Sequence, residues 1–156
     1  MSAAEDVLLE LLHMEVINTF VNENKDKEDA ACKLEYMGFS TGYRFVERAT
    51  RENNRFKDEL DIMKYICKVF WVSIFKKEID NLRTNHQGVY VLNDNNFRFL
   101  SRIAAGKQYL QCAPRFVAFT CGLIRGGLAN LGINCVVTAE VNNLPACKFQ
   151  VQVQRG

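Results

Sequence analysis

The chain has 156 residues, of which 48% are apolar and 24% are charged, and its net charge at pH 7 is +2. This length suits one domain, so we expect a single domain over residues 1–156. The apolar content is too high and the net charge too low for intrinsic disorder. The weak positive charge gives no reason to expect nucleic acid as a partner.

The lack of a recognisable targeting signal and the spacing of the cysteines both favour the cytosol. No apolar run approaches the roughly 20 residues that a membrane-spanning helix needs. The start, Met1 to Asp6, is acidic where a secretory signal is basic. The six cysteines lack Cys-x-x-Cys spacing and there are only two histidines, so we expect reduced thiols and neither a metal nor a disulfide.

Two helices are predicted at the N-terminal end. The first covers about residues 3–22, and its apolar stripe is wider than one neighbour normally covers. The second covers about residues 30–50 and carries Gly38 and Gly42 on its apolar face. Each glycine inside a helix costs about 1 kcal/mol relative to alanine, so we expect the close approach of another helix to offset that cost.

The rest of the chain predicts a mixture of helices and strands. The expected elements are a helix from Phe56 to about Ile74, strands at 78–84 and 89–92, a helix from Pro114 to just before Gly132, and strands at 135–141 and 148–154. Apolar residues surround the helix after Pro114, which is typical of a central buried helix. This order predicts an α+β fold, in which a four-stranded antiparallel sheet carries its helices on one face.

No set of residues predicts catalysis. The glycine-rich run 122–127 lacks the Lys-Ser/Thr that completes a phosphate loop. The acids at 58, 59 and 61 are interpreted as complementing a helix dipole, and Arg125 as paired with a carboxylate or extended to the surface. We therefore expect no enzyme activity and no cofactor. Basic residues between Lys76 and Arg115 fit a solvated surface, or one that faces an anionic membrane or an acidic partner.

Four stretches of the chain resemble the small subunits of the TRAPP trafficking complex. They are Phe56–Lys64, Asp80–Gly88, Ala118–Leu128 and Pro145–Val151, and the likeness extends over essentially the whole chain. The resemblance implies the α+β fold of those subunits, which is similar to that of haem-based nitric-oxide sensor domains. It also implies a non-catalytic structural subunit of a complex that tethers vesicles and catalyses nucleotide exchange on a Rab GTPase. Such a subunit would be cytoplasmic and peripheral to the cis-Golgi and endoplasmic reticulum membranes.

The resemblance further implies dimerisation with the family's third small subunit through the first two helices of each partner, with a homodimer as another possibility. The apolar faces of the two predicted helices agree with such a four-helix contact. The interface residues expected on this basis are Leu8, Leu11, Leu12, Val16, Leu34, Gly38, Gly42 and Phe45. The alternative is that these residues pack only on the sheet of their own domain. A dimer role also predicts that Gly38→Leu blocks dimerisation and leaves the domain folded.

One position departs from the family pattern. The third-subunit branch carries an acylated cysteine where this chain has Asn53, so no fatty-acyl group is expected here. The alternative function is a small-ligand or lipid-binding module, which predicts an apolar cavity of at least about 300 Å³.

Overall fold

The computed structural model describes residues 27–50, 56–97, 109–141 and 146–154. The predicted first helix and the turn at 142–145 lie outside these residues. The elements are α2 (Lys27–Ala49), α3 (Glu59–Tyr65), the π-helical turn η1 (Ile66–Phe70), α4 (Trp71–Phe75), β1 (Asn81–Thr84), β2 (Val89–Asp94), α6 (Tyr109–Asn130), β3 (Cys135–Glu140) and β4 (Cys147–Val153). They confirm the expected order of helices and strands.

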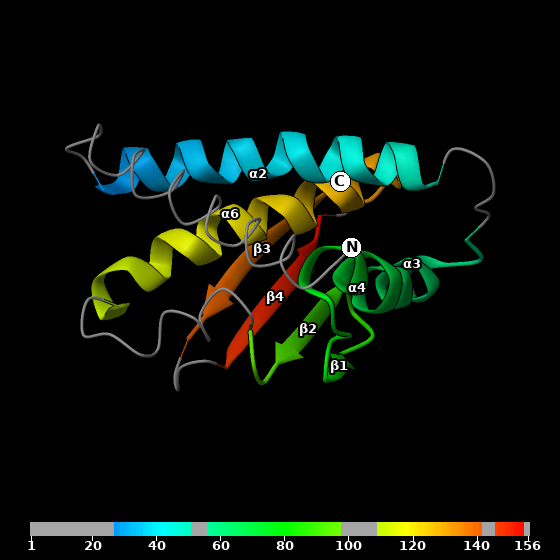
Figure 1. The fold of residues 1–156 in the computed structure, drawn as a ribbon. Helices are drawn as coiled ribbons and strands as arrows, with labels where there is room; N and C mark the ends of the chain where they lie inside the picture. The colour runs from blue at the N-terminus through cyan, green and yellow to red at the C-terminus, as the bar shows by residue number, and fades with distance from the viewer. Residues whose placement is uncertain (1–26, 51–55, 98–108, 142–145, 155–156) are drawn as a thin grey trace.

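The four strands form one antiparallel sheet in the order β1-β2-β4-β3. In β4, the buried Phe149 and Val151 alternate with the exposed Lys148, Gln150 and Gln152, so the sheet has one apolar and one polar face. Figure 1 shows α6 lying across the sheet and α2 lying over α6, with α3 and α4 beside them. The predicted α+β class with helices on one face is confirmed.

Helix α6 forms the middle layer. Ile124 and Leu128 are fully buried, and Leu123 is nearly so, as the apolar pattern predicted. Gly132 follows the helix with φ of 89°, a left-handed conformation that glycine adopts without strain. The predicted start at Pro114 is wrong, because α6 begins at Tyr109. The fixed φ of proline fits a helix, and the loss of one backbone hydrogen bond does not end it where other contacts hold it.

The helical segment after residue 58 contains a π turn that the sequence pattern did not predict. A π turn holds more residues than an α turn, so it rotates every later side chain about the helix axis. Here Phe70, Trp71 and Phe75 are all buried, whereas Val69 is 50% exposed and Val72 is 41% exposed. Val69 therefore faces solvent, although its spacing from the buried Ile66 would fit one apolar stripe of a regular helix.

Four aromatic side chains fill the core between this segment and the sheet. Trp71 contacts Phe75 with ring centroids 4.4 Å apart and Phe149 with centroids 5.4 Å apart. Phe97 completes the cluster, 5.1 Å from Phe75 and 5.4 Å from Phe149. Such tilted and edge-on pairs add to the free energy of burying the rings. The cluster joins β4 to α4.

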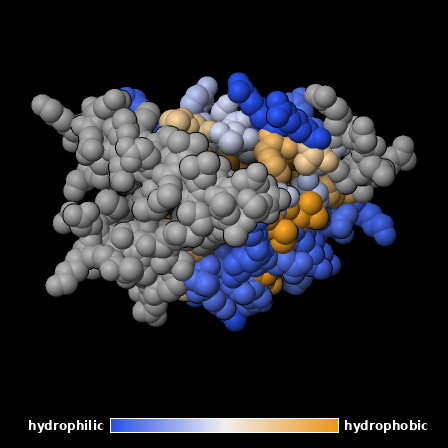
Figure 2. Space-filling view, viewed as in Figure 1, coloured by the Kyte–Doolittle hydropathy of each residue, from blue (hydrophilic) through white to orange (hydrophobic). Residues whose placement is uncertain are grey.

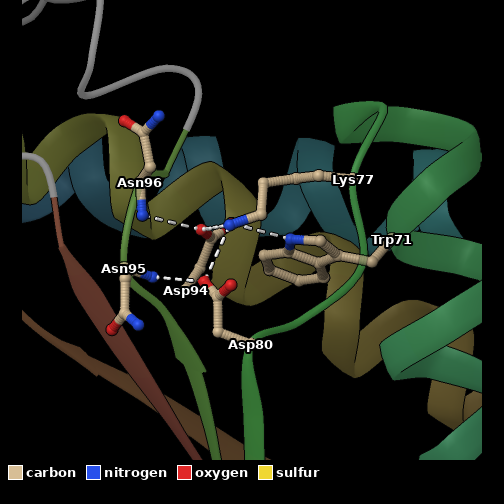
Figure 3. A network of polar contacts seen from close by, with 6 residues as sticks. All are labelled: Trp71, Lys77, Asp80, Asp94, Asn95 and Asn96. Carbon is tan, nitrogen blue, oxygen red and sulfur yellow. Dashed lines mark hydrogen bonds and ion pairs between the residues drawn. The ribbon is translucent and has the colours of Figure 1, made fainter.

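A buried carboxylate ties α4 to the end of β2 (Figure 3). Asp94 is fully buried and accepts hydrogen bonds from Trp71 Nε1 at 2.9 Å, Lys77 Nζ at 2.7 Å and the Asn96 backbone N–H at 3.0 Å. A buried charge costs much free energy unless it is paired and hydrogen-bonded, and here it is both.

The exposed half of the same network centres on Asp80. Its Oδ2 atom accepts from Lys77 Nζ at 2.7 Å and from the Asn95 N–H at 2.7 Å. The hydrogen bond from Lys77 lowers the pKa of Asp80 from its ordinary value of 3.8, and burial opposes this only in part. Burial acts to lower the pKa of Lys77, but its bonds to Asp80 and Asp94 outweigh burial and raise it above 10.5.

We predict that Asp94→Ala destabilises the fold by about 3–5 kcal/mol, because it leaves a buried indole N–H and the Lys77 ammonium without their acceptor. Asp80→Ala removes a partly exposed partner and is expected to cost about 1 kcal/mol or less. Urea unfolding followed by the fluorescence of Trp71, the only tryptophan, measures both. Equal losses for the two variants would contradict the central role of Asp94.

Acid is expected to weaken this anchor through Asp80. A carboxyl whose pKa is lowered by folding contributes stability above its ordinary value, here 3.8, and loses it as the pH falls through the folded value. The free energy of unfolding should therefore fall below pH 3.8, and Asp80→Asn should remove part of that fall. Unfolding measured at neutral pH and in acid tests this. An unchanged acid dependence in the variant would show that the pair contributes nothing.

Candidate interaction surface

Helix α2 lies directly against α6 through glycine residues on both helices. A β-carbon added to Gly38 would collide with the carbonyl oxygen of Phe119, and one added to Gly42 would collide with the carbonyl oxygen of Leu123. The backbones are therefore closer here than any larger residue allows. This confirms the prediction that another helix closely approaches the two glycines.

The contact is reciprocal. A β-carbon on Gly122 of α6 would collide with the carbonyl oxygen of Glu35, and one on Gly126 with that of Phe39. Gly127 differs, because its added β-carbon would meet the side chains of Val46 and Phe70 instead of backbone. The glycines of the run 122–127 thus allow the close approach of α2 and α6 from the α6 side.

The four predicted interface residues that lie on α2 make contacts within the domain. Leu34 is fully buried in the core, and the Phe45 ring packs edge-on against Phe70 with centroids 5.6 Å apart. The helix that approaches Gly38 and Gly42 is α6 of the same chain, whereas the sequence analysis assigned this helix to a partner. The remaining predicted residues, Leu8, Leu11, Leu12 and Val16, lie outside the described residues.

The expectation that Gly38→Leu leaves the domain folded is therefore wrong. The obstacle is the backbone of α6, which cannot move aside as the end of a side chain can. A large side chain at Gly38 is therefore expected to disturb the packing of α2 on α6 within this chain.

The opposite face of α2 carries exposed aromatic side chains. Tyr36 is 70% exposed and Tyr43 is 40% exposed, and their separation of seven positions, about two helical turns, places both on one side of the helix. Phe39 stacks on Tyr43 with ring centroids 6.2 Å apart. Together with Ser40 and Arg44 these rings line a shallow depression of about 210 Å³. We call Tyr36, Phe39, Ser40, Tyr43 and Arg44 the α2 outer face.

Sequence analysis missed the α2 outer face because it followed aliphatic and glycine residues. The available signal was the spacing of Tyr36 and Tyr43 on the side away from Gly38 and Gly42. Exposed tyrosine is typical of binding surfaces, since it combines a large apolar ring with a hydroxyl that hydrogen-bonds in water or to a partner.

Arg125 joins the two helices at the edge of this face. Its Nε lies 3.1 Å from Glu35 Oε1, and its guanidinium lies 4.6 Å above the ring of Phe39. The first contact is an ion pair and not a directed hydrogen bond, because the Nε–H does not point at the oxygen. The predicted carboxylate partner of Arg125 is confirmed. The contact also fixes the ring of Phe39 within the α2 outer face.

The acidic residues at the start of α3 have structural roles. Asp58 caps the helix, and its side chain accepts a hydrogen bond from the Asp61 N–H at 2.8 Å. Glu59 accepts a hydrogen bond from the Tyr90 hydroxyl at 2.7 Å and so links α3 to β2. His86 lies in the β1–β2 turn with φ of 61°, and its N–H donates to Thr84 Oγ1.

The buried cysteines are poor nucleophiles. Burial raises the pKa of Cys67 and Cys121 to about 12 and that of Cys135 to about 11, and it raises the pKa of Cys147 as well. Their thiols therefore stay protonated at neutral pH. Within the described ranges, the structure brings together no three His, Cys, Asp or Glu side chains that could hold a metal ion.

Comparison with known proteins decides the family. The sequence profile of the family described as "Transport protein particle (TRAPP) component" matches residues 9–154. The chain belongs to the TRAPP component family.

Several of its relatives are named as sixth subunits of the complex. It is 58% identical to "Trafficking protein particle complex subunit 6b" of Danio rerio and to subunit 6B of Homo sapiens, over 97% of this chain and 99% of each relative. It is 49% identical to subunit 6A of Homo sapiens over 98% of this chain and 99% of that one. The identity to the B-type subunits is thus greater than that to the A-type subunit.

A solved structure supports the fold independently. A TRAPP complex subunit 3 of Naegleria fowleri, covalently bound to palmitic acid, superposes with a TM-score of 0.82 at 14% identity, over 99% of this chain and 98% of that one. Among the described helices, none is long and apolar enough to cross a membrane.

The α2–α6 contact predicts different costs for the same substitution at two glycines. Gly38→Ala places a methyl group against backbone and is expected to destabilise the domain by about 2 kcal/mol or more, despite the better helix propensity of alanine. Gly127→Ala meets only side chains that can shift, so it should cost clearly less. Urea unfolding curves of the two variants measure the difference. A larger loss for Gly127→Ala would show that the α6 backbone is not the obstacle to a side chain at Gly38.

Proposed function

We propose that this chain is a non-catalytic structural subunit of a TRAPP complex and that it dimerises with the family's third small subunit. The observation that carries the proposal is 58% identity to sixth subunits over nearly the full length of both chains. In this proposal the complex tethers vesicles and promotes nucleotide exchange on a Rab GTPase between the endoplasmic reticulum and the Golgi. The chain reaches those membranes only as a peripheral part of the complex.

The proposed contact with the third subunit uses the α2 outer face. Its apolar rings are exposed, while the glycine face of the same helix is occupied by α6. An aromatic centre bordered by Ser40 and Arg44 matches the composition of protein interfaces, where tyrosine and arginine are enriched. We propose that Leu8, Leu11, Leu12 and Val16 contribute beside it, as the family resemblance implies. Leu34, Gly38, Gly42 and Phe45 would then support the interface from inside the domain.

Palmitic acid in the related subunit 3 structure belongs to that protein. The family resemblance implies that Asn53 stands at the position of the acylated cysteine, and its amide cannot form a thioester. We therefore propose a subunit that acts through protein contacts, and not the lipid-binding module.

The double variant Tyr36→Asp/Tyr43→Asp should abolish the heterodimer and leave the fold intact. Two carboxylates would be placed in a desolvated contact, whereas in the isolated chain both positions face solvent. Co-expression with the third subunit followed by analytical ultracentrifugation measures the loss. The matched control is Val136→Asp, which changes a 48% exposed residue of β3 on the other side of the domain and should leave the heterodimer unchanged. Retention of the heterodimer by the tyrosine variant would remove the α2 outer face from the interface.

A further inference from the structure

A second exposed surface lies on the segment that contains the π turn. Lys64, Lys68 and Val72 follow one another along its solvent side, and Val69 lies next to them. Figure 2 shows apolar side chains beside strongly polar ones over the region where Figure 1 places α3 and α4. We call Lys64, Lys68, Val69 and Val72 the π-turn face.

The π turn explains why this face combines valine with lysine. It keeps Phe70, Trp71 and Phe75 in the core, and as a result Val69 and Val72 point to solvent with exposed fractions of 50% and 41%. In the isolated domain these two valines face solvent, so the free energy that their burial would add to stability is not gained. A partner that covers them recovers this free energy.

Within the part of the chain that the structure describes, the two lysines of the face have no carboxylate partner. Asp61, one turn before Lys64, uses its Oδ2 atom to accept the Lys57 N–H at 3.1 Å. Among the described residues neither Lys64 nor Lys68 forms an ion pair, in contrast to Lys77, which is held by two carboxylates. The face therefore presents uncompensated positive charge beside an apolar centre.

We infer that the π-turn face binds an acidic segment of another protein subunit, whose carboxylates pair with Lys64 and Lys68 and whose apolar side chains cover Val69 and Val72. The inference rests on the proposed role as a subunit of a larger complex, and it adds a contact separate from the α2 outer face. Apolar centres with a charged border are the usual arrangement at such contacts, and the border charges favour a partner of opposite sign.

The composition favours a protein over a lipid surface. Segments that lie on membranes carry tryptophan, phenylalanine or leucine on their apolar side, and here only two valines are present. Two lysines on an anionic membrane contribute about 1 kcal/mol each, which is too little to hold a protein there without further anchors. A fitted protein segment instead buries the valines completely.

Photo-crosslinking in the assembled complex tests the inference. The tagged chain is expressed in cells with a photoactivatable benzoylphenylalanine in place of Val69, the complex is purified, and crosslinked peptides are identified by mass spectrometry. The matched control places the same group at Val136, a valine of similar exposure on β3. A second comparison is Lys64→Glu/Lys68→Glu against Arg83→Glu/Lys148→Glu, which reverses the same number of charges on exposed residues of β1 and β4.

The expected result is a crosslink from position 69 to a glutamate- or aspartate-rich segment of a co-purifying protein. Its yield should fall about tenfold in Lys64→Glu/Lys68→Glu and stay unchanged in Arg83→Glu/Lys148→Glu. No crosslinked protein, a crosslink to phospholipid, or a segment without excess acid would overturn the inference. Co-purification of other TRAPP subunits with the unmodified chain is scored first. Its absence would contradict the proposed function, whereas its presence without the crosslink would contradict this inference alone.

Discussion

The structure depends on the backbone contact between α2 and α6. Gly38 and Gly42 on one helix, and Gly122 and Gly126 on the other, remove the side chains that would otherwise hold the helices apart. Each glycine costs helix propensity, and close packing of the two backbones offsets that cost. The buried residues of α6 fix this helix on the sheet. The backbone contact with α6 then fixes the position of α2.

This arrangement gives each side of α2 a different role. The glycine side is closed against α6, so the side that carries Tyr36 and Tyr43 is turned outward. The Arg125 guanidinium, between Glu35 and Phe39, helps to keep the outer rings in place. Asp94 likewise holds α4 to the end of β2, and the π turn leaves Val69 and Val72 facing solvent. Internal anchors thus determine which faces are available to partners.

Much of the fold could be predicted from sequence, because it follows from local periodicity. The strict alternation in Lys148–Gln154 predicted a strand with one wet face, and the all-round apolar pattern after Pro114 predicted a central helix. The π turn could not be predicted, since Ile66–Phe70 also fits ordinary helical spacing. Local sequence patterns likewise could not identify the helix that packs against Gly38 and Gly42. Spacing shows that a helix comes close but does not show which helix, and only the tertiary structure identifies α6.

The central claim is that α2 uses its glycine side within the domain and its aromatic side toward a partner. Hydroxyl-radical footprinting of the chain alone and in complex with the third small subunit tests it directly, because oxidation of a tyrosine ring follows its exposure to solvent. The account predicts that Tyr36 and Tyr43 are oxidised readily in the isolated chain and are strongly protected in the complex. Equal oxidation of both tyrosines in the two states, in a preparation where the complex is intact, would contradict it.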